Sequence, residues 1–139
     1  MSGNARTPQA VLQPRLEMIS RRLGRLLSLR AALSPFQASL RVLGERAREP
    51  DGRRRLLTLW RPCQQRLDLL LDGAPGNSSW AVRLRLLRHE MEDSLIDDVC
   101  NPIALSDLTD ALDQACEAIL LHVQRDLREV VTRLGGGEP

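Results

Sequence analysis

The chain has 139 residues and a formal net charge of +2, and its aromatic side chains are limited to Phe36, Trp60 and Trp80. Leucine supplies 27 residues, so we expect a core of leucines on helices rather than of β-branched and aromatic residues on strands. No apolar run approaches the roughly 20 residues that cross a bilayer, which argues against a membrane span. These features predict a soluble, all-α, cytoplasmic protein.

The first two predicted helices meet at a proline. Apolar residues at alternating spacings of four and three mark one face of a helix over about 8–33. In the stretch SPFQ, Ser34 suits an N-cap, Pro35 suits the first helical position and Gln37 completes a capping box. This pattern predicts that one helix ends there and that a short second helix runs up to the turn EPDG at 49–52.

Three longer helices are expected after that turn. The third covers about 53–72, with Pro62 as a kink, and the stretch DGAPGNSS follows it as a loop. The fourth covers about 80–101 and ends before Pro102. Ser106 is the predicted N-cap of the last and longest helix, which stops at the GGG near the carboxyl end.

Helices of this length with tight connections predict a single helical domain over 1–139, ordered from about 8 to 134 with a flexible tail at 135–139. The predicted fold class is all-α, an antiparallel helical bundle of four long helices plus one short helix. The apolar stripes are also regular enough for coiled-coil seams. A second expectation is therefore an extended helical hairpin that completes its core by dimerising.

Charge is distributed unevenly along the chain. Residues 1–88 hold 17 arginines and 6 acidic residues, while residues 89–139 hold 3 arginines and 12 acidic residues. Three interpretations are open: the acidic last helix neutralises basic helices within the fold, a protein partner binds one charged face, or arginines contact nucleic-acid phosphates. Every basic residue is arginine, a bias typical of a GC-rich genome, from which we expect a bacterial source.

The candidate partner-binding residues are three arginine clusters and both tryptophans: Arg21, Arg22, Arg25, Arg53, Arg54, Arg55, Arg83, Arg85, Arg88, Trp60 and Trp80. Clustered arginines suffice for salt-sensitive phosphate contact but read no base sequence. No aromatic side chain is interleaved with them for base stacking. The tryptophans occupy stripe positions, which predicts core anchors, or binding hot spots if the bundle leaves them uncovered.

The stretch RHEMEDSLIDD at 88–98 brings a histidine and several carboxylates together. His89, Asp93 and Asp97 share one helix face, and they suit a divalent ion if a second helix supplies further ligands. Di-metal helical bundles instead use Glu-x-x-His pairs, a spacing that this sequence lacks. We therefore expect an exposed acidic face, with no metal and no cofactor.

Cys63 and Cys116 lie on apolar stripes and are predicted to be buried, while Cys100, at a helix end, is the expected exposed thiol. The three cysteines form no C-x-x-C pair, which indicates neither a disulfide framework nor a zinc site. No phosphate-binding or dinucleotide motif occurs, so no small-molecule substrate is indicated. We expect a non-enzymatic interaction protein, such as an adaptor, a small subunit of a complex or a chaperone-like protein that binds a protein partner or itself. The alternative is an arginine-rich nucleic-acid-binding subunit.

Overall fold

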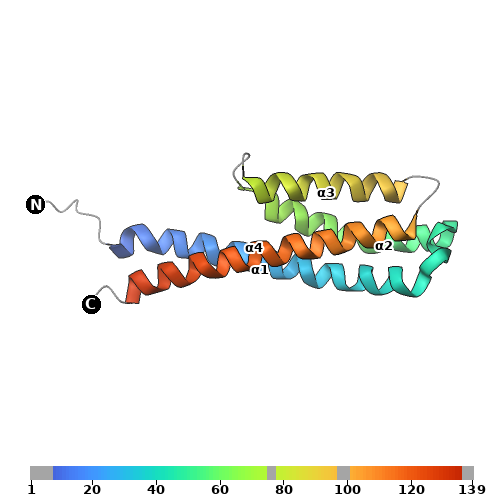
Figure 1. Cartoon of the computed structure of the whole chain (residues 1–139). Coiled ribbons are helices and arrows are strands. Elements are labelled where there is room, and N and C mark those ends of the chain that lie inside the picture. Colours follow the sequence, from blue (N-terminus) through green and yellow to red (C-terminus); the bar gives the residue numbers. More distant parts are fainter. Residues whose placement is uncertain (1–7, 75–77, 97–100, 136–139) are drawn as a thin grey trace, which may run out of the picture.

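The computed structural model describes residues 8–74, 78–96 and 101–135, and within these ranges it contains helices and no strands. The elements are α1 (Pro8–Leu43), the 3-10 helix η2 (Gly44–Arg48), α2 (Pro50–Leu71), α3 (Ser79–Ile96) and α4 (Pro102–Gly135). α1 contacts α2 and α4, and α3 contacts the same two helices, with neighbours antiparallel (Figure 1). The predicted antiparallel bundle of long helices is confirmed, while dimerisation stays a prediction.

α1 continues through the break predicted at Pro35, so two expected helices form one helix of 36 residues. A proline inside a helix removes one hydrogen bond and crowds the preceding turn, which costs about 3 kcal/mol. Burial of Leu33, Phe36 and Leu40 offsets this cost, because a fully buried Leu or Phe side chain contributes roughly 1.5–3 kcal/mol. α1 ends instead at Leu43, and the next residue, Gly44, has a φ of 52°, the left-handed conformation that closes many helices. Of the predicted short helix, only η2 remains separate.

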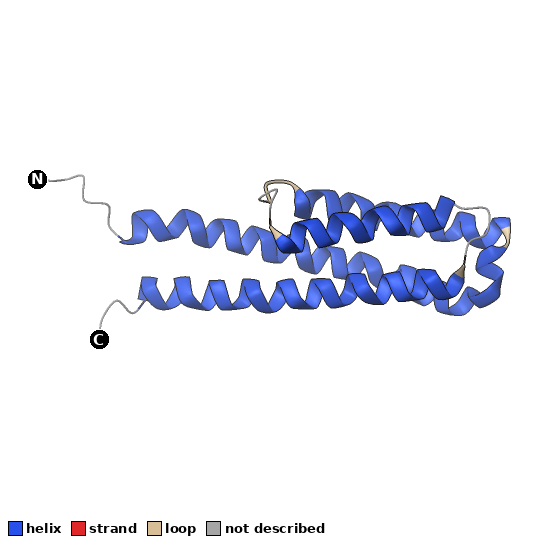
Figure 2. Cartoon of the chain, turned by 45° about the horizontal axis from the view of Figure 1, so that its top comes forward, coloured by secondary structure: helices blue, strands red, loops and turns tan. Residues whose placement is uncertain are grey.

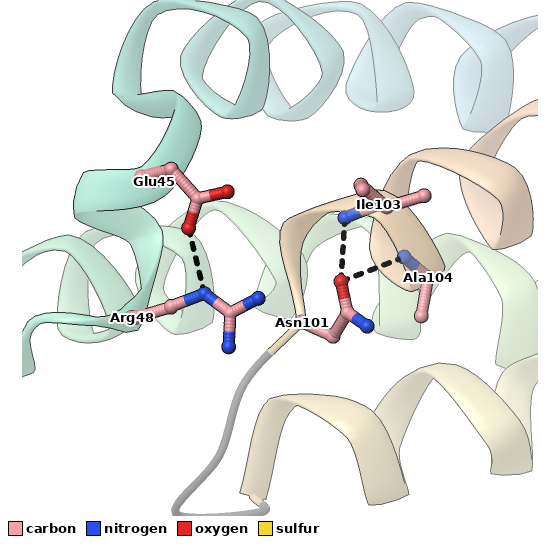
Figure 3. Close-up of polar contacts among 5 residues, drawn as sticks. All are labelled: Glu45, Arg48, Asn101, Ile103 and Ala104. Atoms are coloured by element: carbon pink, nitrogen blue, oxygen red, sulfur yellow. Dashed lines mark hydrogen bonds and ion pairs between the residues drawn. The ribbon is translucent and has the colours of Figure 1, made fainter.

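α4 begins four residues before its predicted N-cap, Ser106. The Asn101 Oδ1 atom accepts the backbone N–H of Ile103 at 2.9 Å and that of Ala104 at 3.4 Å (Figure 3). Pro102 occupies the first helical position, where its missing N–H has no intrahelical partner to lose. Asn101 is therefore the N-cap of α4, and the prediction of Ser106 was wrong.

α2 begins at Pro50, three residues earlier than predicted, and Pro62 lies inside it without dividing it. α3 is described only as far as Ile96, so the predicted continuation of that helix to Asn101 lies outside the described residues. The predicted exposed thiol of Cys100 and nearly all of the predicted tail also lie outside them.

The core is organised by residues that repeat every seven positions on the two longest helices. The buried row on α1 is Leu12, Ile19, Leu26, Leu33 and Leu40. The buried row on α4 is Thr109, Cys116, Val123 and Val130. A strict seven-residue repeat is the pattern of helices that wind around each other as a left-handed supercoil. α2 and α3 add the predicted stripes that contain Leu56, Trp60, Leu84 and Met91 to the same core.

The helices differ in length, and this difference shapes the molecule. α1 and α4 have 36 and 34 residues, whereas α2 and α3 have 22 and 18. The amino-terminal part of α1 and the carboxyl-terminal part of α4 therefore project together beyond α2 and α3 (Figures 1 and 2). The Arg22 guanidinium lies 5.3 Å from the centroid of the Trp80 ring, near the first residue of α3, and His122 of α4 lines the same groove as Trp80. We call residues 8–21 and 123–135 the two-helix extension.

Two glycines provide a matched test of the packing between η2 and α2. A Cβ atom at Gly52 would overlap the Arg46 carbonyl oxygen, so Gly52→Ala should lower the free energy of unfolding by about 1–3 kcal/mol. A Cβ atom at Gly24 meets nothing within 4 Å, so Gly24→Ala should raise that free energy by up to about 1 kcal/mol, because alanine is the better helix former. Urea unfolding followed by circular dichroism measures both. Equal effects would contradict the close approach at Gly52.

Candidate interaction surface

The predicted arginine clusters are divided among α1, α2 and α3, and adjacent residues in each cluster point in different directions because a helix turns by about 100° per residue. Arg22 stacks over Trp80, and Arg25 Nη1 donates to the Leu69 carbonyl oxygen at 2.9 Å. The exposed members are Arg21, Arg54, Arg55, Arg83 and Arg85, while Arg53 and Arg88 are half-buried. The three sequence clusters therefore do not form three surface patches, because the members of each cluster have different neighbours.

The two tryptophans occupy different environments. Trp60 is 3% exposed and meets Phe36 edge to face, with ring centroids 5.8 Å apart. It is the core anchor that its stripe position predicted, and it offers no surface to a partner. Trp80 is half-buried at the start of α3, where it lines a groove with Ala115 and Ile119 of α4.

The basic and acidic parts of the chain meet at a few defined points. Arg30 on α1 reaches two carboxylates of α4, with Nε 3.6 Å from Asp113 Oδ1 and Nη1 3.0 Å from Glu117 Oε2. Arg88 on α3 pairs with Asp68 on α2 and with Glu92 on its own helix. These side chains are partly exposed, so each pair contributes about 0–1 kcal/mol and does more for the register of the helices than for stability. Among the described residues, Arg30 and Arg88 thus form ion pairs between helices, whereas Arg48, Arg54 and Arg133 pair with acidic residues close to them in the sequence.

A second set of arginines lines the junction of α1 with α2. The side-chain contacts here pair α1 residues of rising number with α2 residues of falling number, as an antiparallel pair requires. Arg66 Nε donates to Ser28 Oγ at 2.9 Å, Cys63 Sγ lies 3.3 Å from the Ala32 carbonyl oxygen, and Arg55 Nε donates to Ser39 Oγ at 3.1 Å. We define the basic seam as Arg21, Arg25 and Arg46 of α1 and η2 with Arg55 and Arg66 of α2.

The positions that form the basic seam hold no acidic residue, and Asp72 lies beside Arg21 and Arg25 at the end of α2. On α1 and η2 these positions are 21, 25, 28, 32, 35, 39, 42 and 46, and on α2 they are 55, 59, 62, 66 and 69. Between the arginines lie small and apolar side chains, of which Val42 is 74% exposed and Leu69 is 52% exposed. Two grooves run along the seam, one lined by Arg21, Arg25 and Arg66 and the other by Val42, Arg46 and Arg55. The seam therefore combines cationic groups with exposed apolar surface.

Sequence reasoning found three of these arginines and missed Arg46 and Arg66. Their signal was available, because 21, 25 and 46 share one face of a helix with the alternating four and three spacing, as do 55 and 66. The break predicted at Pro35 divided the first row and hid it.

In the acidic stretch around His89, the side chains of His89, Glu90 and Asp93 are exposed, whereas Glu92 is partly buried beside Arg88. His89 Nε2 lies 3.3 Å from Asp93 Oδ2, and both side chains are more than two-thirds exposed. Asp97, the third proposed ligand, lies outside the described residues. Within the described ranges, no group of three or more potential ligands is arranged to hold a metal ion.

Cys63 and Cys116 are buried free thiols, as their stripe positions predicted. Burial raises the pKa of the Cys63 thiol to about 11. Burial and, to a smaller extent, the charge of Asp113 raise the pKa of the Cys116 thiol to about 12. Both thiols are therefore protonated at neutral pH and are poor nucleophiles.

By fold the chain is an all-α protein of antiparallel packed helices with a basic seam on one side. No protein-family model, no curated protein and no solved structure matches it. In the described part of the chain, no helix combines the length and the apolarity needed to cross a membrane.

The raised thiol pKa values predict a loss of stability in alkali. The sequence has no lysine or tyrosine, so few other groups titrate between pH 9 and pH 12. Below the unfolded pKa of about 9 both thiols are protonated in both states; above it the unfolded chain ionises first, which favours unfolding. The free energy of unfolding should fall by about 2–3 kcal/mol from pH 8 to pH 10.

Urea unfolding across this pH range, with reductant present, measures the loss. The double variant Cys63→Ala/Cys116→Ala should be less stable at neutral pH, because it leaves cavities, but its stability should depend much less on pH. An unchanged slope in the variant would assign the alkaline effect to other groups.

Proposed function

We propose that this chain is a non-enzymatic interaction protein whose basic seam binds an acidic, amphipathic helical segment of another protein. The observation that carries the proposal is the composition of the seam: five arginines with exposed Val42 and Leu69 between them, and Asp72 as an acidic neighbour at one end. An amphipathic helix laid along such a seam places its apolar face on the groove and its carboxylates beside the arginines. An adaptor or a small subunit of a complex requires this kind of surface.

Several arginine side chains of the seam are held in place by hydrogen bonds, and this supports binding to carboxylates. Arg55 and Arg66 are held by the hydroxyls of Ser39 and Ser28, and Arg25 is held by the end of α2. Side chains that are already ordered lose less conformational entropy when a partner binds. Guanidinium groups also bind carboxylates through two parallel hydrogen bonds, which gives orientation as well as attraction.

Nucleic acid is the competing partner for the same seam. From residue 21 to residue 46 the seam is about 37 Å long by the helical rise of 1.5 Å per residue, which suffices for several phosphates. However, Val42 and Leu69 would then meet a charged, hydrated backbone, and the seam has no aromatic side chain for stacking on bases. The exposed apolar residues therefore favour a protein helix.

Two probes of equal charge separate these partners: a synthetic helix with leucine on one face and glutamate on the other, and a short DNA duplex. We expect the peptide to bind more tightly at physiological salt in fluorescence anisotropy. The variant Arg21→Gln/Arg46→Gln/Arg55→Gln should weaken peptide binding about tenfold or more, because each exposed ion pair contributes up to about 1 kcal/mol.

The matched control is Arg83→Gln/Arg85→Gln/Arg125→Gln, which removes the same charge from exposed positions on α3 and α4. It should retain most of the affinity. Equal losses in the two variants would show attraction to net charge rather than to the seam. Tighter binding of the duplex, with a steep loss as salt rises, would favour the nucleic-acid partner.

A further inference from the structure

The outer flank of the α1–α4 pair can be located from the Arg30 ion pairs. Arg30 and Asp113 lie opposite each other and remain 32% and 43% exposed beside the four-helix part, so this flank faces solvent rather than α2 or α3. In an antiparallel pair, a step of seven residues back along α1 matches a step of seven forward along α4. These steps place Leu23 opposite Leu120 and Leu16 opposite Leu127 on the same flank.

Along the two-helix extension and the turns next to it, this flank is apolar. We define the outer leucine face as Leu16, Leu23, Leu27, Leu120, Leu127 and Val131. Leu27 is 49% exposed and Val131 is 52% exposed, and the other four are half-buried at the edge of the core. On α1, Ser20 lies between Leu16 and Leu23 in the alternating spacing, and no charged residue interrupts the row from Leu16 to Leu27 at these positions.

The opposite flank of the extension behaves differently. On α4 the row Leu112, Ile119, Asp126 and Arg133 repeats every seven residues. Its first two members are buried, and its last two, beyond the start of α3, are charged. His122 also pairs with Asp126, and Arg133 with Glu129. α4 is therefore polar where the cover of α3 ends, yet it keeps leucines on the outer flank, which no described helix covers. On α1, Val11 and Met18 are exposed apolar residues of the extension on the side of α2.

We propose that the outer leucine face is a homodimer interface. The second copy packs the same face against the first and runs in the reverse direction, so that two α1–α4 pairs form a four-helix arrangement at the extensions. The face has the charge layout that this arrangement requires. Glu117 lies on its bundle side, Arg128 lies toward the termini, and the uncharged Gln124 lies between them. Reversing a second copy about Gln124 places one Gln124 opposite the other. Arg128 then lies about three residues, roughly 5 Å, along the helix from the partner's Glu117, a carboxylate that Arg30 contacts within each copy. A polar residue at the centre of a helical seam is a known means of setting register.

The size of the face predicts a weak dimer. It is about 20 Å long by the helical rise and about two helix diameters wide, so two copies would bury on the order of 1,000 Å² in total, the lower end for specific interfaces. The basic seam is not part of this face. The inference therefore goes beyond the proposed function and does not depend on it, and a dimer would present two basic seams.

Sedimentation velocity over a concentration series from about 1 µM to about 500 µM covers the affinity expected of so small an interface. We expect the native chain to pass from monomer to dimer. The variant Leu27→Glu/Val131→Glu should raise the dissociation constant at least tenfold, about 1.4 kcal/mol, because both side chains are exposed in the monomer and would be buried in the dimer. Circular dichroism checks that the variant is folded.

The matched control is Val82→Glu/Leu86→Glu, since these residues of α3 are 44% and 59% exposed and lie away from the face. It adds the same charge and should dimerise like the native chain. A native chain that stays monomeric throughout the series, or two variants that dimerise equally well, would overturn the proposal.

A cross-linking experiment tests the end-for-end arrangement. In a Cys100→Ser background, Gln124→Cys should form a disulfide-linked dimer under mild oxidation, because the two copies of residue 124 meet at the centre. Gln65→Cys, exposed on α2, should not. Equal cross-linking of the two variants would reject this arrangement.

Discussion

The packing of α1 against α4 is the interaction on which the rest of the structure depends. Both helices bury residues at every seventh position over nearly their whole length, from Leu12 to Leu40 and from Thr109 to Val130. α2 and α3 cover only part of this pair (Figure 1). The molecule thus has two cross-sections, with four helices at one end and two at the other. The location of the basic seam and of the outer leucine face follows from this difference.

The continuity of α1 through Pro35 makes the long pair feasible. Had the chain turned at Ser34, α1 would have been about ten residues shorter, and Arg46 would not continue the row begun by Arg21 and Arg25. The local signals for a helix end in SPFQ are real, but their energy is about 1 kcal/mol for a cap, less than the burial of Phe36 and Leu40 provides. Tertiary packing therefore overrode a correct local pattern.

The balance between local sequence signals and tertiary packing also explains which features could be predicted. The apolar stripes identified the core, including Trp60, Cys63 and Cys116, because burial on a helix requires a regular spacing that the sequence displays. The N-cap at Asn101 was missed because Asn, Ser and Thr are nearly equivalent caps and Ser106 also precedes an apolar run. The basic seam could not be assembled without the register of α1 on α2, which depends on contacts such as Arg66 with Ser28.

The uneven distribution of charge along the sequence does not become a simple division of the surface. Arg30 and Arg88 are engaged by acidic residues within the fold, whereas Arg25, Arg46, Arg55 and Arg66 of the basic seam contact serines and backbone carbonyls. α1 packs against the acidic α4 and against α2 at two separate junctions. A chain with one basic and one acidic part can therefore be neutral at one helix junction and strongly cationic at the next.

The antiparallel path also brings the first turn of α1 and the last turn of α4 to the same end of the molecule (Figure 2). A mechanical force that pulls the first turn of α1 away from the last turn of α4 would act perpendicular to the α1–α4 junction rather than along it. Such a load peels the helices apart one heptad layer at a time, beginning in the extension, before it reaches the part that α2 and α3 reinforce. The extension would therefore open at low force while the four-helix part stayed closed.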